Sequence, residues 1–145
     1  AHEKPSFRSA FKAKRCLIPA DGFYEWRKEG KTRTPFFIHR ADGAPMVFAG
    51  LWESRKGPDG GPLVSAAILT AAAGPDTAGL HDRVPVLITP PEFSAWLARE
   101  TPPDKLRALC HAPPDGALTF HQVSARVGSV ANDDARLVEP MDQAS

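Results

Sequence analysis

Hydrophobic and polar positions alternate in short runs along most of the chain, and proline or glycine separates these runs. Stretches rich in β-branched and aromatic residues predict strands over residues 15–18, 22–27, 35–39, 46–52, 63–70, 84–89 and 118–123. Helical spacing of apolar residues predicts two short helices, over residues 91–99 and 103–110. The Asp-Gly pair within residues 40–45 predicts a hairpin that joins the strand before it to the strand after it. This pattern favours an α+β fold with a curved, barrel-like, mostly antiparallel sheet and short flanking helices.

Length and composition indicate a single globular domain over residues 1–145. The chain is 42% hydrophobic and 24% charged, which is an ordinary globular balance, and its 15 prolines are scattered rather than gathered into a linker. No apolar run approaches the roughly 20 residues that cross a bilayer, so we expect no membrane partner. Two cysteines do not make a disulfide framework, which favours a reduced, cytoplasmic setting.

Charge is distributed unevenly along a chain whose formal net charge is only +1. Residues 1–40 hold ten lysines and arginines against four acidic residues, whereas the remainder holds eight against thirteen. A basic front of this kind is typical either of an anion-binding face or of a lysine-rich solvated surface.

Two side chains stand in contexts that suit proton transfer. Glu25 lies between two aromatic residues in an apolar strand, where partial burial would favour the neutral acid. The plainer interpretation places it on the wet face of an alternating strand. His81 precedes an acid, a base and an apolar strand, so a neighbour could orient it for proton transfer. The plainer interpretation is a turn histidine beside a surface ion pair.

The sequence gives no sign of a metal or cofactor site. The five histidines are scattered, and no spacing typical of zinc ligands or of a phosphate-binding glycine loop occurs. Cys110 lies on the apolar face of its expected helix and Cys16 begins a strand, so both are expected to be inert buried thiols. We therefore expect no metal and no cofactor.

Taken together, several sequence blocks resemble the SOS response-associated peptidase (SRAP) family in content, order and spacing. These blocks are Pro5-Ser6-Phe7-Arg8, Phe11-Lys12, residues 15–26 (RCLIPADGFYEW), residues 35–38 (PFFI), residues 48–53 (FAGLWE), residues 81–87 (HDRVPVL) and Val138-Glu139-Pro140. The resemblance covers nearly the whole chain, and the longest two blocks are specific enough to favour functional roles for Glu25 and His81.

The resemblance implies a sensor of abasic sites in single-stranded DNA. In this family the amine of an N-terminal Cys condenses with the sugar aldehyde, and its thiol closes a thiazolidine crosslink. The family is also credited with removing its leading peptide and with β-elimination at abasic sites. The motif Glu matches Glu25, which would hold and deprotonate the amine, and the motif His matches His81, which would protonate the sugar oxygen. Contacts to DNA are expected from Arg83, Arg8, Trp26 and, as a weaker candidate, Thr70.

The sequence departs from the family pattern at its front. The family begins Met-Cys-Gly-Arg and carries an Asn-Ala-Arg motif, and this chain begins downstream of both, so it resembles the C-terminal two thirds of the domain. We expect an exposed sheet edge, and poor folding unless the chain pairs with the missing segment or with another copy. Crosslinking by this chain alone is not expected. The competing readings are a non-covalent single-stranded DNA-binding module and a peptidase acting on other polypeptides.

Overall fold

The computed structural model describes residues 5–129 and 131–141, and the chain divides into two compact units. Unit 1 comprises Ala1–Pro19, Val47–Ala72 and Pro85–Ala112, and unit 2 comprises Ala20–Met46, Ala73–Val84 and Pro113–Ser145. Each unit therefore collects segments that are far apart in the sequence.

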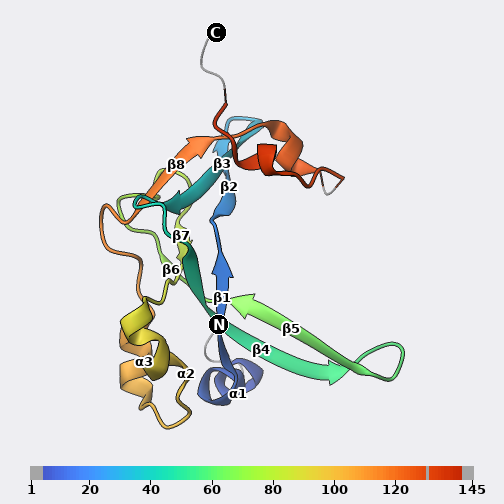
Figure 1. Ribbon diagram of the computed structural model, residues 1–145, viewed down its shortest axis with the longest axis vertical. Helices are drawn as coiled ribbons and strands as arrows, with labels where there is room; N and C mark the ends of the chain where they lie inside the picture. Colours follow the sequence, from blue (N-terminus) through green and yellow to red (C-terminus); the bar gives the residue numbers. More distant parts are fainter. Residues whose placement is uncertain (1–4, 130, 142–145) are drawn as a thin grey trace. The chain divides into compact units, whose positions relative to one another are not determined.

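Unit 1 combines a three-stranded sheet with three short helices. The sheet has the order β1-β4-β5, and β4 and β5 form a long antiparallel hairpin (Figure 1). The elements of this unit are α1 (Pro5–Ala13), β1 (Arg15–Ala20), β4 (Met46–Lys56), β5 (Pro62–Ile68), β6 (Thr70–Ala72), the 3-10 helix η1 (Pro90–Glu92), α2 (Phe93–Leu97) and α3 (Pro103–Leu109).

The core of unit 1 forms around Trp96, which is completely buried. The Trp96 indole Nε1 donates a hydrogen bond to the Cys16 carbonyl oxygen at 2.9 Å, and Phe11 packs against the ring edge to face. Arg15 is buried nearby and donates from Nε to the Trp96 carbonyl oxygen at 2.6 Å. Burial lowers the pKa of this guanidinium, and backbone carbonyls accept its hydrogen bonds. The α1 helix, β1 and α2 are joined by these contacts.

Unit 2 is built on a second three-stranded sheet with the order β2-β3-β8. Both pairings are antiparallel, and β2 turns into β3 at Gly30, whose φ of 64° is in the left-handed region that glycine tolerates. The elements are β2 (Phe23–Glu29), β3 (Thr32–Arg40), β7 (Arg83–Pro85), β8 (Leu118–Gln122) and the 3-10 helices η2 (Ala125–Gly128) and η3 (Ala135–Val138). Strand β7 lies at the boundary between segments, since its last residue belongs to unit 1.

Close packing at the start of β2 explains one glycine. A Cβ atom at Gly22 would lie 2.4 Å from the Ile38 carbonyl oxygen and 2.5 Å from the Phe37 ring, so only glycine fits between β1 and β2. Ile38 and Phe37 are themselves buried in the centre of the sheet.

The predicted hairpin between residues 35–39 and 46–52 is wrong. Strand β3 pairs with β2 and β8, whereas β4 pairs with β1 and β5 in the other sheet. The Asp-Gly signal marks a tight turn all the same, because the Asp42 carboxylate accepts hydrogen bonds from Arg40 and from the Ala44 amide. This turn carries the chain from one unit to the other instead of pairing its flanking strands.

The expected α+β class with antiparallel pairing is confirmed. Within the described residues the strands form separate sheets, and closure into a barrel stays a prediction. One helix, α1, lies where the sequence analysis predicted neither a helix nor a strand. Across residues 5–129 and 131–141, no helix has the length and apolar character needed to cross a membrane.

Candidate functional site

Strand β2 presents Glu25 and Trp26 on opposite faces of the unit 2 sheet. Glu25 lies directly opposite Phe36 in the ladder, and residues paired in this way share a face. Glu25 is half-buried, and Phe36 is buried, so this face is not the fully solvated one that the plainer interpretation expected. Two residues along the strand, the Arg27 guanidinium lies over the Phe36 ring at 4.6 Å from its centroid. The carboxylate therefore has an aromatic and a cationic neighbour on its own face.

The other face of this sheet carries a continuous set of aromatic and imidazole rings. Tyr24 lies 5.5 Å from Phe37, centroid to centroid, and 6.4 Å from Trp26. The His39 and His121 rings lie 5.5 Å apart, centroid to centroid, and each ring contacts Phe37. Trp26 is half-buried at one end of this set, where one side of its indole could stack on a base.

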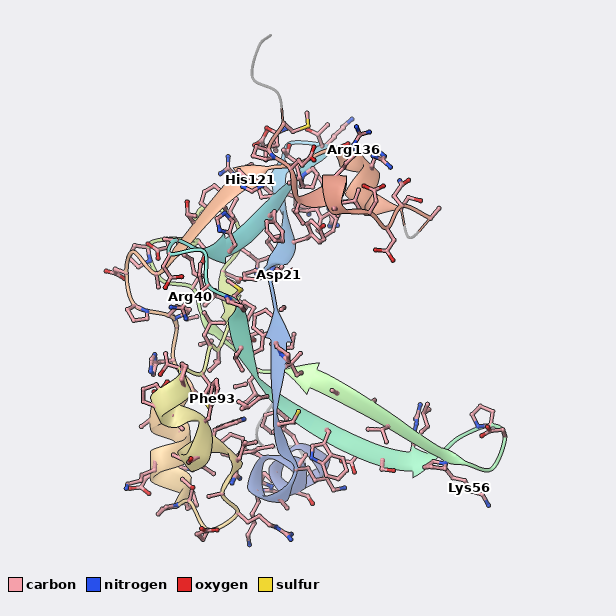
Figure 2. The ribbon with its side chains drawn as sticks, in the orientation of Figure 1. Asp21, Arg40, Lys56, Phe93, His121 and Arg136 are labelled. Carbon is pink, nitrogen blue, oxygen red and sulfur yellow. The ribbon has the colours of Figure 1, made fainter. Side chains whose placement is uncertain are left out.

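Negative charge flanks the aromatic face. Burial raises the pKa of the Tyr24 phenol, and the charges of Asp133 and Asp134 raise it further. The segment that carries these acids is held to the sheet, because His121 Nε2 on β8 donates to the Val138 carbonyl oxygen at 2.6 Å. Figure 2 labels His121 on β8 and Arg136 in this segment. Arg126 pairs with Asp134 at 2.9 Å, so part of this negative charge is already balanced within unit 2.

The loop that carries His81 is folded around one buried residue, Thr77. The Thr77 carbonyl oxygen accepts from the Leu80 amide at 2.9 Å and from the His81 amide at 3.1 Å. Leu80 is buried beneath the loop, and the His81 ring is about half exposed, with 47% of its side-chain surface accessible. The loop is thus ordered by its own backbone while the ring remains open to a ligand.

A carboxylate ties this loop to the sheet that bears Glu25. Both oxygens of Asp76 accept from the Gly116 amide, at 3.0 and 2.9 Å, and one accepts from the Leu118 amide at 3.2 Å. Leu118 begins β8, which pairs with β3, and β3 pairs with β2. Glu25 and His81 therefore belong to the same unit and are connected through this carboxylate and the sheet.

The His81 ring has two neighbours at the same nitrogen. The Arg83 amide donates to Nδ1 at 3.1 Å, and the Asp82 Oδ1 atom lies 3.2 Å from Nδ1. Because Nδ1 accepts a hydrogen bond, the proton of the neutral ring is on Nε2. In the protonated ring Nδ1 carries a proton as well and can donate to Asp82 instead. Nε2 is consequently a donor in both forms.

The remaining predicted DNA contacts are divided between the units. Trp26 and Arg83 belong to unit 2 with Glu25 and His81, whereas Arg8 and Thr70 belong to unit 1. Arg8 is exposed on α1, Thr70 begins β6, and Arg83 begins β7.

Neither cysteine has the environment of a reactive thiol. Burial raises the pKa of both Cys16 and Cys110, and the Cys110 Sγ atom lies 3.3 Å from the Leu106 carbonyl oxygen, as expected for a helical thiol that donates to its own helix. Among the residues that the structure describes, no group of three or more His, Cys, Asp or Glu side chains could hold a metal ion.

Sequence reasoning missed Asp76 and the imidazole pair of His39 and His121. Asp76 lies between Pro75 and Thr77 in a turn-like sequence, and nothing local shows that its partners are 40 residues away. Phe37 and His39 are two positions apart along β3, and this spacing could have predicted that both rings lie on one face of the sheet.

The fold is α+β, and one of its units carries both Glu25 and His81. The model of the SOS response associated peptidase (SRAP) family matches residues 1–130, and the chain belongs to this family. The chain is 38% identical over 139 residues to the abasic site processing protein YoqW of Bacillus subtilis, covering 94% of this chain and 62% of the relative. It is 33% identical over 139 residues to the abasic site processing protein YedK of Escherichia coli, covering 93% and 61%.

Two solved structures have a fold similar to that of this chain. A protein from Bacteroides thetaiotaomicron matches with a TM-score of 0.87 at 24% identity, covering 97% of this chain and 62% of that one. A protein from Bordetella bronchiseptica matches with a TM-score of 0.75 at 30% identity, covering 86% and 62%. The chain thus spans about three fifths of the length of the relatives and structures named here.

Proposed function

We propose that this chain is the acid–base and DNA-binding part of a protein that processes abasic sites in single-stranded DNA. Two of its relatives are abasic site processing proteins, which supports this substrate class. The observation that carries the proposal is the half-exposed His81 ring, whose Nδ1 faces the Asp82 carboxylate at 3.2 Å, so that the protonated ring can hold Nδ1–H on Asp82 and donate its Nε2 proton to a ligand. A half-buried carboxylate on the same unit, Glu25, supplies the complementary base.

The proposed reaction begins with an abasic sugar in its closed form. His81 in its protonated form donates its Nε2 proton to the ring oxygen, the bond between C1 and that oxygen breaks, and the C1 hydroxyl gives its proton to water, which exposes the aldehyde. Glu25 accepts a proton from an N-terminal Cys ammonium, and the free amine adds to the aldehyde carbon. Loss of one water gives an imine, and addition of the Cys thiol to the imine carbon closes the thiazolidine. One water is released, and no oxidant or reductant is needed.

The nucleophile in this scheme is an N-terminal Cys, whereas the two cysteines among the 145 residues are internal. Amine and thiol must belong to the same residue to close the ring, so Cys16 and Cys110 cannot replace it. We therefore propose that the chain alone binds abasic DNA without crosslinking to it, and that the remaining family length supplies the N-terminal Cys. Self-removal of a leading peptide and β-elimination belong to the same proposal, as does a cytoplasmic, nucleoid-associated location.

DNA is held in this proposal by cations and one aromatic ring. Arg83 and Arg8 contact phosphates, Trp26 stacks on a base, and Thr70 contributes a hydroxyl. The excess of lysine and arginine in residues 1–40 favours a second candidate function, a binding module that holds single strands without reacting. Such a module would show strong salt dependence and no covalent product in any context.

The test uses a chimera in which the leading segment of YoqW, up to the start of the match, precedes residue 1. Crosslinking rates to an abasic oligonucleotide are measured for Glu25→Gln and His81→Ala, with Glu29→Gln and His111→Ala as matched controls on exposed residues. We expect each site variant to slow crosslinking about 100-fold or more, the usual scale of general acid–base catalysis, and each control to keep its rate. Unchanged rates in both site variants contradict the roles, and a chimera that binds but never crosslinks favours the binding module.

A further inference from the structure

The hairpin formed by β2 and β3 ends in a group of exposed cations. Residues 27–34 (RKEGKTRT) contain four lysines and arginines and one acidic residue. Lys28 lies directly opposite Arg33 in the ladder, and both side chains are exposed. Like charges directly opposite one another destabilise an antiparallel pair, so the hairpin itself gains nothing from this arrangement. A bound anion would replace the repulsion between the two side chains by an attraction that both share.

The two faces of the hairpin differ in how their cations are paired. On the face that carries Glu25, the Arg27 Nη1 and Glu29 Oε1 atoms lie 3.6 Å apart and form an ion pair. On the opposite face, Lys28 and Arg33 have no ion-pair partner among the residues that the structure describes. The positive charge of this second face is therefore available to a ligand.

This positive charge continues the aromatic face of unit 2. Trp26 and Lys28 are two positions apart along β2, so both side chains lie on one face. Their partners across the ladder, Pro35 and Arg33, share that face. Two residues of an antiparallel strand span about 6.8 Å, so the long cationic side chains lie close to the half-buried indole. An aromatic ring beside cations suits a nucleic acid strand, whose base stacks on the ring while its phosphate reaches the cations.

The opposite charges of this face adjoin different parts of it. The acids Asp133 and Asp134 act on Tyr24, which is two positions from Trp26 in the direction away from Lys28. Strand β8 pairs with residues 36–40 of β3 and not with residues 32–34, so it does not cover the cationic end of the hairpin. The end of the hairpin therefore presents positive charge alone on this face.

We propose that Lys28 and Arg33 together hold one phosphate of single-stranded DNA, next to the nucleotide whose base stacks on Trp26. The Cβ atoms of two residues paired in this way are about 5 Å apart, so both long side chains can reach the same phosphate. The guanidinium can donate two hydrogen bonds to phosphate oxygens, and the ammonium donates from the other side. This phosphate clamp deepens the proposed function and rests on it, because the proposed function makes Trp26 the ring that stacks on a base.

The experiment measures the affinity of the 145-residue chain for a single-stranded oligonucleotide of about 15 nucleotides that carries one tetrahydrofuran abasic analogue. This analogue has no aldehyde, so binding is measured without any crosslink. Fluorescence anisotropy titrations at several salt concentrations give the slope of the logarithm of the affinity against the logarithm of the salt concentration. Thermal melts confirm that each variant folds.

The double variant Lys28→Gln/Arg33→Gln should lower the magnitude of this slope by about 0.7, the value for one phosphate of a single strand. Over the tenfold range from about 1 M to about 0.1 M salt, this corresponds to about a fivefold loss of affinity. Lys28→Arg/Arg33→Lys keeps both charges and should keep the slope. The matched control Lys105→Gln/Arg107→Gln removes two exposed charges from α3 and should also keep it.

Neutral methylphosphonate linkages, introduced one at a time into the oligonucleotide, locate the contact. One linkage should weaken binding of the unsubstituted chain about fivefold when it is neutralised. That loss should disappear in Lys28→Gln/Arg33→Gln, because the variant no longer contacts the phosphate. A loss of the same size in the double variant would contradict the clamp.

Three other results would overturn the inference. The first is a slope that Lys28→Gln/Arg33→Gln leaves unchanged, and the second is no binding of the oligonucleotide at all. The third is an equal fall of the slope in the Lys105→Gln/Arg107→Gln control, because net charge alone would then explain the effect.

The clamp and the proposed reaction can fail separately. If the chimera crosslinks and depends on Glu25 and His81 while the slope does not depend on the hairpin cations, the clamp alone is refuted. If the slope depends on the hairpin cations while Glu25→Gln and His81→Ala keep their crosslinking rates, the catalytic roles alone are refuted.

Discussion

Replacing Asp76 with Ala should loosen the His81 loop without unfolding the protein. The Asp76 carboxylate accepts hydrogen bonds from two backbone amides, those of Gly116 and Leu118, at distances between 2.9 and 3.2 Å. Hydrogen bonds to a charged group contribute about 1.5 kcal/mol each at the low end, or about 3 kcal/mol for two. Asp76 is only half-buried, and solvent screening reduces this to about half. The expected local cost is thus about 1.5 kcal/mol, which is about a tenfold change in an opening equilibrium.

Amide hydrogen exchange measured residue by residue by NMR is the appropriate assay. In Asp76→Ala, exchange at Gly116, Leu118 and His81 should accelerate about tenfold, while the central amides of β3 keep their rates. Asp59→Ala is the matched control, because Asp59 is also a loop carboxylate that accepts a backbone hydrogen bond, from Gly61 at 3.0 Å. Unchanged amide exchange at Gly116 and Leu118 would refute the role of the Asp76 hydrogen bonds in holding the loop. Uniform acceleration at all amides would show that the substitution destabilises the whole protein instead.

Three further predictions follow from the contacts described above. Trp96→Ala should lower the free energy of unfolding by about 3–5 kcal/mol, because the ring is fully buried and its Nε1 donates a hydrogen bond. Urea titrations measure this change, and a loss below about 1 kcal/mol would contradict the role of Trp96 as the centre of the unit 1 core. Tyr24 is the chain's single tyrosine, so absorbance at 295 nm reports it alone, and its titration midpoint should lie above 10. Because folding favours the neutral phenol, Tyr24 contributes its full stabilisation below the pKa of the unfolded state. This stabilisation is lost as the pH rises through the pKa of the folded state. Tyr24→Phe should remove this dependence of stability on pH. Nitrogen NMR of His81 should show the Nε2–H tautomer in the neutral ring, and a dominant Nδ1–H tautomer would contradict the bond from Arg83.

The local elements were largely predictable because they depend on nearby residues. Strands β2 and β8 and helix α3 lie where apolar alternation or helical spacing predicted them. The helix α1 was not predicted, although Phe7, Ala10 and Phe11 have the helical spacing that would have indicated it.

The pairing of strands could not be deduced in the same way. The turn at Asp42 is as strong a hairpin signal as any in the chain, yet β3 and β4 lie in different sheets. Partner choice depends on burial of Phe36 and Ile38 against distant strands, which the local sequence does not encode. For the same reason Asp76 was missed, since its partners are remote in sequence.

The candidate site was predicted from resemblance rather than from periodicity. From the residue pattern alone, Glu25 was interpreted as a solvated strand residue and His81 as a turn histidine. Only the resemblance to the family favoured functional roles for both. The structure adds the Nδ1 contacts of His81 and the pairing of β6, which begins with Thr70, with β7, which begins with Arg83.

Intact-protein mass tests the central claim most directly, before and after incubation with a single-stranded oligonucleotide that carries one abasic site. The account predicts that the 145-residue chain keeps its own mass, and that the chimera with the YoqW leading segment gains one oligonucleotide less one water. An undamaged oligonucleotide should add nothing to either protein. A chimera that gains no mass would contradict the proposed reaction. An adduct on the 145-residue chain alone would also contradict it, because the amine of Ala1 or a lysine would then be the nucleophile.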